Sequence, residues 1–175
     1  MSNLDLDNAF WRFSLKVYAA PGVEAECLAL QQAYDIDVNV LLFGAWLGAE
    51  RRERLDATGL DRARSAVCAW QETVVKPLRS ARRAIKAAAG SAEPAAGLLR
   101  PAVARAEIDA ERIEQALLFA QAPAASPTAS GSCQPSHAVR DNIGLILGSY
   151  SAGSTERTAF PQAIAAAALA VAAQR

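Results

Sequence analysis

The sequence contains few of the residues that build metal sites and disulfide-stabilised folds. It has one histidine, His137, and three cysteines, Cys27, Cys68 and Cys133, none of them in a CxxC pair. Metal sites with nitrogen and sulfur ligands need such residues at short, regular spacing. An odd and scattered set of cysteines also argues against a disulfide framework and favours a reducing compartment. We therefore expect neither a metal site nor a disulfide.

An excess of charge of one sign is also missing. Lys+Arg and Asp+Glu are both 18, so the formal net charge at pH 7 is +0. Dedicated nucleic-acid binders usually carry a basic excess that neutralises phosphates. Nucleic-acid binding therefore stays an alternative that the composition does not favour.

Long hydrophobic runs are missing as well. No uncharged apolar run near the N-terminus or in the middle of the chain approaches the roughly 20 residues that cross a bilayer. The Ala-rich run near the C-terminus is interrupted by Gln162 and is only weakly hydrophobic. The first residues are acidic and lack the apolar segment of a signal peptide. We expect a cytoplasmic protein with no membrane span.

Recognisable catalytic motifs are absent. The sequence has no glycine-rich phosphate loop, no serine nucleophile elbow and no metal-ligand spacing. Cys133 and His137 lie four residues apart, but no third group is visible that would orient the pair for nucleophilic attack. We therefore predict no catalytic residue and no cofactor.

Helical periodicity runs through the chain instead, and no segment alternates as a strand does. The pattern predicts an all-α fold, with a compact bundle of about five main helices over residues 4–121. Asp5 or Asp7 is expected to cap the first helix. Asp37 is expected to cap the third, which is apolar nearly all round over residues 38–47 and should be central and buried.

The fourth predicted helix carries the most regular apolar stripe in the sequence. The stripe repeats at steps of three or four residues: Leu60, Ala63, Val67, Trp70, Val74 and Leu78. Pro77 lies inside it, where a proline clashes with the Thr73 carbonyl group and removes a backbone donor. We expect either a kink near residues 75–76 or a helix break, and an end by Gly90.

A fifth helix should begin between Pro94 and Pro101, because proline suits the first turn of a helix. Its apolar residues recur in alternating steps of four and three, as in a seam that packs on another helix. This predicted seam supplies interaction-surface candidates: Leu99, Val103, Ala106, Ala110 and Ile113. Phe10 and Trp11 are further candidates, because adjacent residues point to different faces of a helix and one of them can be exposed.

The composition changes after the fifth helix. Residues 122–137 are rich in Pro, Ala, Ser, Thr and Gly and are typical of a flexible linker. Residues 138–175 follow as an Ala-rich helical tail. Its small residues make short helices marginal unless they dock, so we expect a weakly anchored tail.

An ordered series of aromatic, Pro-Gly and Pro-Leu-Arg elements lies within residues 5–121. Its members are Phe10-Trp11, Tyr18, Pro21-Gly22-Val23, Cys27-Leu28, Leu30-Gln31, Asp37-Val38, Trp46, Trp70, Val74-Val75, Pro77-Leu78-Arg79, Arg82-Arg83 and Lys86. The series resembles a family of small proteobacterial helical proteins that is catalogued as a domain of unknown function. That resemblance implies no activity, ligand or catalytic residue.

A basic cluster on the fourth helix is the sharpest local feature: Lys76, Arg79, Arg82, Arg83 and Lys86. One interpretation is a platform for anions such as phosphates, nucleic acid or an acidic protein surface. The other is a solvated helix face whose charges are partnered by carboxylates. Glu107, Glu111 and Glu114 on the fifth helix could supply those partners if the two helices pack antiparallel. They would then pair with Arg82 or with residues earlier on the fourth helix such as Arg64; a carboxylate metal site is the less favoured alternative.

Three functional hypotheses follow from these features. The first is a non-catalytic helical interaction module that binds a protein partner or itself. The second is an anion or nucleic-acid binder that uses the basic cluster. The third is an enzyme that acts on a small molecule in a pocket lined by Trp46 and Trp70.

Overall fold

The computed structural model describes residues 4–92, 95–122, 133–151 and 159–174, and every regular element in these ranges is helical. In chain order the elements are α1 (Ala9–Tyr18), α2 (Val23–Tyr34), α3 (Val38–Glu50), α4 (Ala57–Trp70), the π-helical turn η1 (Gln71–Val75), α5 (Lys76–Ala92), α6 (Ala95–Phe119), α7 (Pro135–Tyr150) and α8 (Gln162–Ala172). The predicted all-α fold is confirmed. In the described ranges, we find no helix with the length and apolar character needed to cross a membrane.

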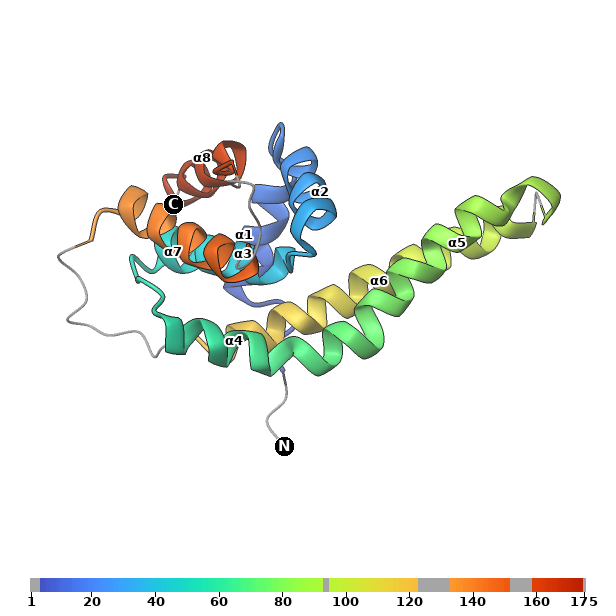
Figure 1. Cartoon of the computed structure of the whole chain (residues 1–175), viewed down its shortest axis with the longest axis horizontal. Coiled ribbons are helices and arrows are strands. Elements are labelled where there is room, and N and C mark those ends of the chain that lie inside the picture. Colours follow the sequence, from blue (N-terminus) through green and yellow to red (C-terminus); the bar gives the residue numbers. More distant parts are fainter. Residues whose placement is uncertain (1–3, 93–94, 123–132, 152–158, 175) are drawn as a thin grey trace.

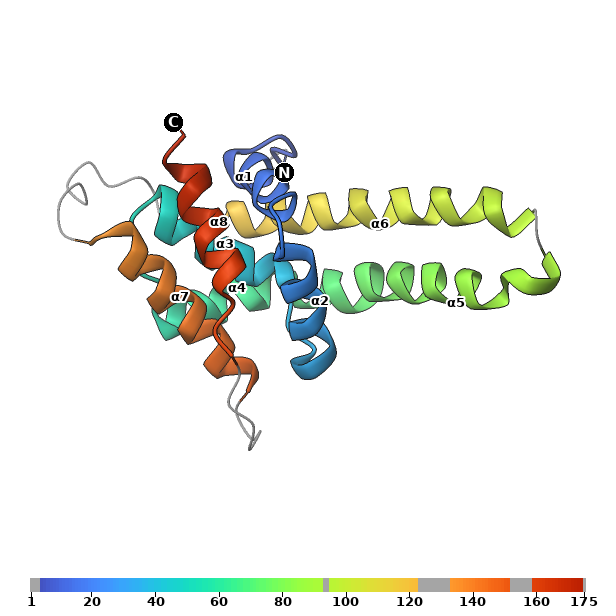
Figure 2. The same cartoon turned by 90° about the horizontal axis from the view of Figure 1, so that it is seen from above.

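Helix α3 forms the centre of the molecule, with α1, α7 and α8 packed around it (Figures 1 and 2). All residues from Asn39 to Ala49 are buried, as the apolar pattern predicts. An aromatic cluster joins α3 to its neighbours: Phe10 packs on Phe43 with ring centroids 5.5 Å apart, and Trp46 on Phe119 at the same distance. Such pairs add stability beyond the area that they bury.

The helix caps agree with the sequence at one predicted position and differ at the other. The Asp37 side chain accepts hydrogen bonds from the backbone N–H groups of Asn39 and Val40, as predicted. Helix α1 is capped by Asn8 rather than by Asp5 or Asp7, because the Asn8 side chain accepts from the backbone of residue 11. The cap therefore lies one residue after the later of the two predicted positions.

Helices α4, η1 and α5 form one continuous segment, so the bundle over residues 4–121 has about five main helices, as predicted. Neither predicted effect of Pro77 describes the segment fully. A π-helical turn lies just before the proline, in which Lys76 N donates to Gln71 O, one residue further back than in an α-helix. The extra residue shifts the buried stripe by one position. Val75 is consequently fully buried, whereas Val74 is only half-buried.

The expectation of a weakly anchored tail is wrong. Ile143 and Ile146 of α7, and Ile164 of α8, have no exposed surface and belong to the main core. Helix α7 begins at Pro135, inside the predicted linker; residues 123–132 of that linker lie outside the described residues. The tail docks because α7 presents a regular apolar stripe to α3, and burying this stripe outweighs the low stability of a short isolated helix.

A fully buried asparagine fixes α7 against α3. Asn142 Nδ2 donates to the carbonyl oxygens of Gly44 and Glu53, each at 2.9 Å, and Asn142 Oδ1 accepts from Leu55 N at 2.7 Å. The side chain thus pairs its buried donors and acceptor with the backbone of α3 and of the segment after it.

Helix α8 is held at its N-terminus by Glu26 of α2. The two carboxylate oxygens accept from Ala163 N at 3.0 Å and from Ile164 N at 2.9 Å. These N–H groups have no partner inside their own helix, and a negative charge there also interacts favourably with the helix dipole. Glu26 therefore acts as a cap supplied by another helix.

Replacing Glu26 by glutamine is expected to lower the free energy of unfolding by about 1 kcal/mol, because the amide loses the charge and one of the two acceptors. Urea unfolding followed by circular dichroism measures this loss. Glu24→Gln is the matched control, since Glu24 is exposed on the same helix. Equal unfolding free energies for the two variants would contradict the capping role.

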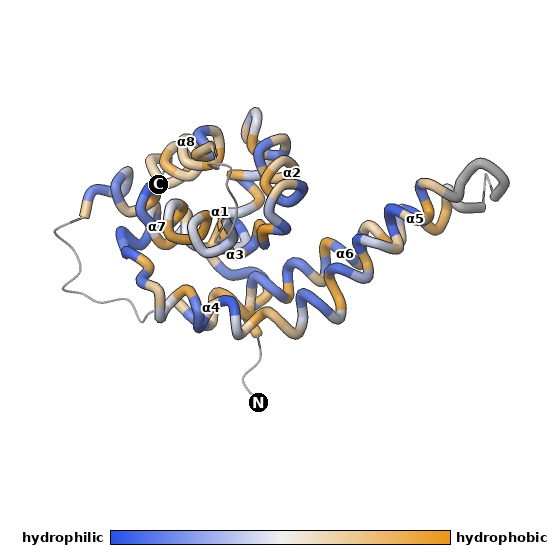
Figure 3. The backbone as a smooth tube through the Cα atoms, in the orientation of Figure 1, coloured by the Kyte–Doolittle hydropathy of each residue, from blue (hydrophilic) through white to orange (hydrophobic). Residues whose placement is uncertain are grey.

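Helices α5 and α6 run antiparallel and project away from the rest of the molecule (Figures 1 and 2). We call residues 76–92 and 95–119 together the arm. Hydrophilic and hydrophobic residues alternate along it, whereas α3 in the body is mainly hydrophobic (Figure 3). The predicted start of the fifth helix is confirmed at residue 95, and Pro101 lies inside the helix.

Candidate functional site

Lys76, at the base of the arm, is held by two carboxylates. Its Nζ donates to Asp35 Oδ2 at 2.9 Å and to Glu72 Oε1 at 2.7 Å. Asp35 comes from the C-terminal cap of α2, and Glu72 lies one turn before Lys76. Lys76 thus joins the base of the arm to the body of the molecule.

Arg79 and Arg82 are paired with the acidic edge of α6. Arg79 Nε donates to Glu107 Oε1 at 3.2 Å, and Arg79 Nη2 donates to Glu111 Oε1 at 2.7 Å. Arg82 Nε donates to the other oxygen of Glu107. Of the two predicted alternatives, Arg82 pairs with the fifth helix, whereas Arg64 lies over the Tyr150 ring instead.

Burial raises the pKa values of Glu107 and Glu111, whereas the neighbouring arginines lower them. Burial alone would raise the pKa of Glu107, but the hydrogen bonds from Arg82 and Arg79 outweigh it and hold that pKa below its ordinary value. Burial also raises the pKa of Glu111, and there Arg79 offsets it only in part. Only 17% of the Arg79 side chain is exposed. These contacts make Arg79 and Arg82 part of the packing between α5 and α6.

The last two members of the basic cluster are placed differently. Arg83 and Lys86 are exposed, and neither has an ion pair with another described residue. The basic cluster therefore divides into three residues that cross-link the structure and two that face solvent.

A groove of about 930 Å³ lies between the arm and the body, and we call it the arm groove. Residues of α1, α2 and α3 supply one wall, and residues of α5 and α6 supply the other. Arg79, Arg82, Arg83 and Lys86 all line it, and Arg100 joins them from α6.

The arm groove also gathers exposed apolar side chains. Seven large apolar side chains are exposed in the described part of the chain, and four of them line this groove: Leu15, Tyr18, Leu28 and Ile108. Leu15 and Tyr18 lie on α1 and Leu28 on the next helix, α2, whereas Ile108 comes from α6, which lies far from them in the sequence. Single exposed apolar residues are ordinary, but a gathering of them in one depression marks a contact site.

The two adjacent aromatic candidates have different environments. Phe10 is fully buried against Phe43 and Trp46, so the expectation that it belongs to an interaction surface is wrong. Helix α1 packs on α3, and its inward face is the one that holds Phe10. Trp11 is half-buried and lines the arm groove, and the Arg112 guanidinium lies 5.6 Å from its ring centroid.

The predicted seam on α6 is not the face that this helix buries. Leu99 and Ala106 are exposed, Val103 and Ile113 are half-buried, and only Ala110 is buried. The buried face instead includes two glutamates along with apolar residues: Glu107, Ala110, Glu114 and Leu118. A search for apolar periodicity misplaces this face, because it counts buried and paired glutamates as solvent-facing.

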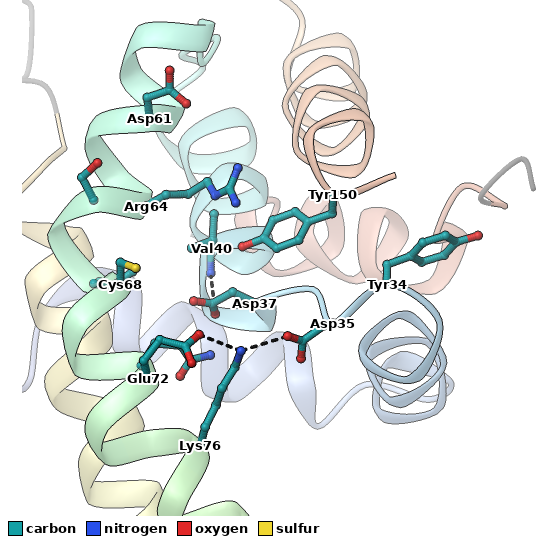
Figure 4. A pocket seen from close by; sticks show the side chains of 13 residues that line it. Tyr34, Asp35, Asp37, Val40, Asp61, Arg64, Cys68, Glu72, Lys76 and Tyr150 are labelled. Atoms are coloured by element: carbon teal, nitrogen blue, oxygen red, sulfur yellow. Dashed lines mark hydrogen bonds and ion pairs between the residues drawn. The ribbon is translucent and has the colours of Figure 1, made fainter. Parts of the chain in front are cut away.

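A second pocket, of about 650 Å³, lies at the base of the arm (Figure 4). Lys76 points between Asp35 and Glu72 there, and the Arg64 guanidinium lies 4.5 Å from the centroid of the Tyr150 ring. The two cations of this pocket are thus engaged with side chains of the pocket itself. This internal pairing makes it a weaker candidate for ligand binding than the arm groove.

A buried acidic pair, Asp37 and Glu114, adjoins that pocket, because Asp37 lines it. Glu114 has no exposed surface, and its Oε2 accepts from Asn39 Nδ2 at 2.9 Å, whereas Oε1 has no donor nearby. Burial and the neighbouring Asp37 carboxylate raise the pKa of Glu114 to about 10. The protonated carboxyl can donate to Asp37, and Gln115 Nε2 donates to Asn39 Oδ1 at 2.8 Å. The cluster holds α6 against the start of α3.

In the ranges that the structure describes, no group of three histidine, cysteine, aspartate or glutamate residues is placed to hold a metal ion. Trp46 is buried in the aromatic cluster of the core. Trp70 is half-buried, and its indole N–H donates to the Ala110 carbonyl oxygen at 3.0 Å. Neither tryptophan lines one of the pockets described above.

Sequence reasoning missed the apolar members of the arm groove and Arg100. Leu15 and Leu28 stand outside the buried stripes of their helices, so an off-stripe leucine was the available signal. Nothing local in the sequence places these residues beside α5 and α6, because that proximity arises only when the arm packs on the body.

The described fold is an all-helical body with a projecting helical hairpin and a groove between the two. Residues 9–118 match the model of a family described as "Protein of unknown function (DUF2390)", and the chain belongs to this family. No curated protein and no solved structure matches the chain.

Proposed function

We propose that this protein is a non-catalytic helical interaction module whose docking site for a partner protein is the arm groove. The observation that carries the proposal is the gathering of Leu15, Tyr18, Leu28 and Ile108 in one groove. Fully burying a large apolar side chain contributes roughly 1.5–3 kcal/mol. The four side chains are 41–53% exposed, so a partner that covers them would gain about half of this amount, roughly 1 kcal/mol, from each.

The contacts of the basic cluster support a protein partner more than a general anion. A platform for phosphates needs several free cations close together. Lys76, Arg79 and Arg82 already bind carboxylates of this chain. Binding of nucleic acid or another anion is therefore the second candidate. It is supported by Arg83 and Lys86 of the basic cluster, with Arg100 beside them in the groove.

Three free cysteines support a further element of the proposal, a reducing compartment such as the cytoplasm. Cys27 is buried and Cys68 is exposed, and no cysteine in the described residues takes part in a disulfide. Free thiols persist where cellular reductants keep them reduced.

Leu28→Asp is expected to reduce partner capture about tenfold or more, because it places a charge among the apolar side chains that the partner would cover. The measurement is quantitative mass spectrometry of proteins captured by the tagged full chain in cells that express it naturally. Leu6→Asp is the matched control: 37% of Leu6 is exposed, against 41% of Leu28, and Leu6 lies outside the groove.

Both variants should keep the thermal midpoint of the wild-type protein, since both side chains are already exposed. A partner that both variants capture as well as wild type does would contradict docking in the arm groove. A partner that both variants lose equally would also contradict it.

A further inference from the structure

We propose that the occupant of the arm groove is an amphipathic helix of a partner protein that carries acidic residues beside its apolar stripe. This inference rests on the proposed function, and it adds the shape and the charge of the partner segment.

The charge of the groove lining favours an acidic occupant. Five cationic side chains line the groove, but only two carboxylates do, those of Glu107 and Glu111. Both carboxylates are already bound by the guanidinium groups of Arg79 and Arg82. The other three cations are exposed and have no ion pair with a described residue: Arg83, Lys86 and Arg100.

This local surplus stands out because the whole chain has a formal net charge of +0. Complementary charge across an interface guides association and suppresses wrong partners. Carboxylates on the occupant would meet Arg83 and Lys86 on α5, and Arg100 on the facing helix α6. Mutual repulsion among these cations would then be relieved on binding.

The apolar lining favours a folded peptide rather than a nucleic acid. Leu15 and Leu28 lie on the body side of the groove, and Ile108 on the arm side. Aliphatic side chains make neither hydrogen bonds nor ion pairs with a phosphodiester backbone. They match the apolar stripe of a helix, which satisfies its own backbone hydrogen bonds and can therefore lie against apolar walls.

The size of the groove agrees with a helix. An α-helix with side chains is about 10 Å across and rises 1.5 Å per residue, so each residue fills on the order of 120 Å³. The groove, with a volume of about 930 Å³ and one open side, is large enough to seat a helical segment of about two turns. Two turns present an apolar residue at i, i+3, i+4 and i+7, which suits the four exposed apolar side chains of the groove.

The test selects binders for the full chain from a displayed library of helical peptides that is random in charge. We expect the enriched peptides to be amphipathic and acidic. Arg83→Glu should weaken their binding about tenfold, because it removes one attractive charge and adds a repulsive one. Arg105→Glu is the matched control, since Arg105 is exposed on α6 outside the groove lining.

The outcomes separate this inference from the proposed function. Enriched peptides that depend on Leu28 but not on Arg83, or that are neutral or basic, overturn the acidic helix and leave the docking groove in place. Peptides that depend on neither residue overturn both, and failure to enrich any peptide overturns the helical occupant.

Two parallel measurements cover the other occupants. A labelled single-stranded DNA that binds the full chain more tightly than the selected peptides, with sensitivity to Arg83→Glu, would replace the peptide by a nucleic acid. Sedimentation of the full chain alone tests for a second copy. A dimer that Leu28→Asp dissociates and Leu6→Asp does not would assign the groove to that copy.

Discussion

Gly48→Ala is expected to lower the free energy of unfolding by about 3 kcal/mol or more, because it forces two packed helices apart. A methyl group at Gly48 would lie 2.5 Å from Val139 N and 2.8 Å from Ala138 C, both backbone atoms of α7. Backbone atoms cannot move aside as the end of a side chain can. The change would disturb the contact between the central helix and α7, on which the docking of the tail depends.

Gly144→Ala is the matched control for this substitution. Gly144 lies on the partner helix α7, and a methyl group added there would meet nothing within 4 Å. Alanine favours a helix over glycine by up to about 1 kcal/mol, so this variant should be as stable as wild type or slightly more stable. Urea unfolding of both variants measures the difference. A loss below about 1 kcal/mol for Gly48→Ala would show that α3 and α7 separate at little cost.

The second large effect concerns the pH dependence of stability. The folded protein keeps a proton on Glu114 up to a pKa of about 10, whereas the unfolded chain releases it near the ordinary value of 4.5. Between these values the unfolded state binds fewer protons, so this group lowers the free energy of unfolding as pH rises. The slope is at most about 1.4 kcal/mol per pH unit for one group.

Glu114→Gln should remove that slope. Glutamine cannot ionise, and its amide can donate to Asp37 and accept from Asn39 as the protonated carboxyl does. The variant should therefore gain stability over wild type progressively as pH rises from about 5 to about 9. Urea unfolding at several pH values measures the gain, with Glu24→Gln as an exposed control. If the free energies of unfolding of Glu114→Gln and wild type changed with pH in parallel, Glu114 would be ionised in the folded protein.

The elements that sequence could predict are those whose signals are local. The apolar run of α3 and the Asp37 cap depend only on neighbours in the chain, and both are confirmed. The docking of α7 depends on a relation between two helices, because Gly44 and Gly48 of α3 make the room that α7 occupies. Neither segment alone carries a signal of this contact, so the sequence predicts a loosely anchored tail where the structure has a docked one.

In the candidate site, too, local features could be predicted from the sequence and most contacts between helices could not. The basic cluster and its possible carboxylate partners could be identified from charge and spacing, and their pairing through Arg82 is confirmed. The face of α6 was misplaced because Glu107 and Glu114 are buried polar residues. The arm groove itself could not be predicted, since it exists only where the arm meets α1 and α2.

Photo-crosslinking from inside the arm groove tests whether a partner protein docks there. A photoreactive amino acid would replace Leu28 in the full chain, expressed in cells that carry the protein naturally, with position 6 as the control. We predict a crosslinked partner protein from position 28 that is absent from position 6. No crosslink beyond the control, or a crosslink to nucleic acid alone, would contradict the account.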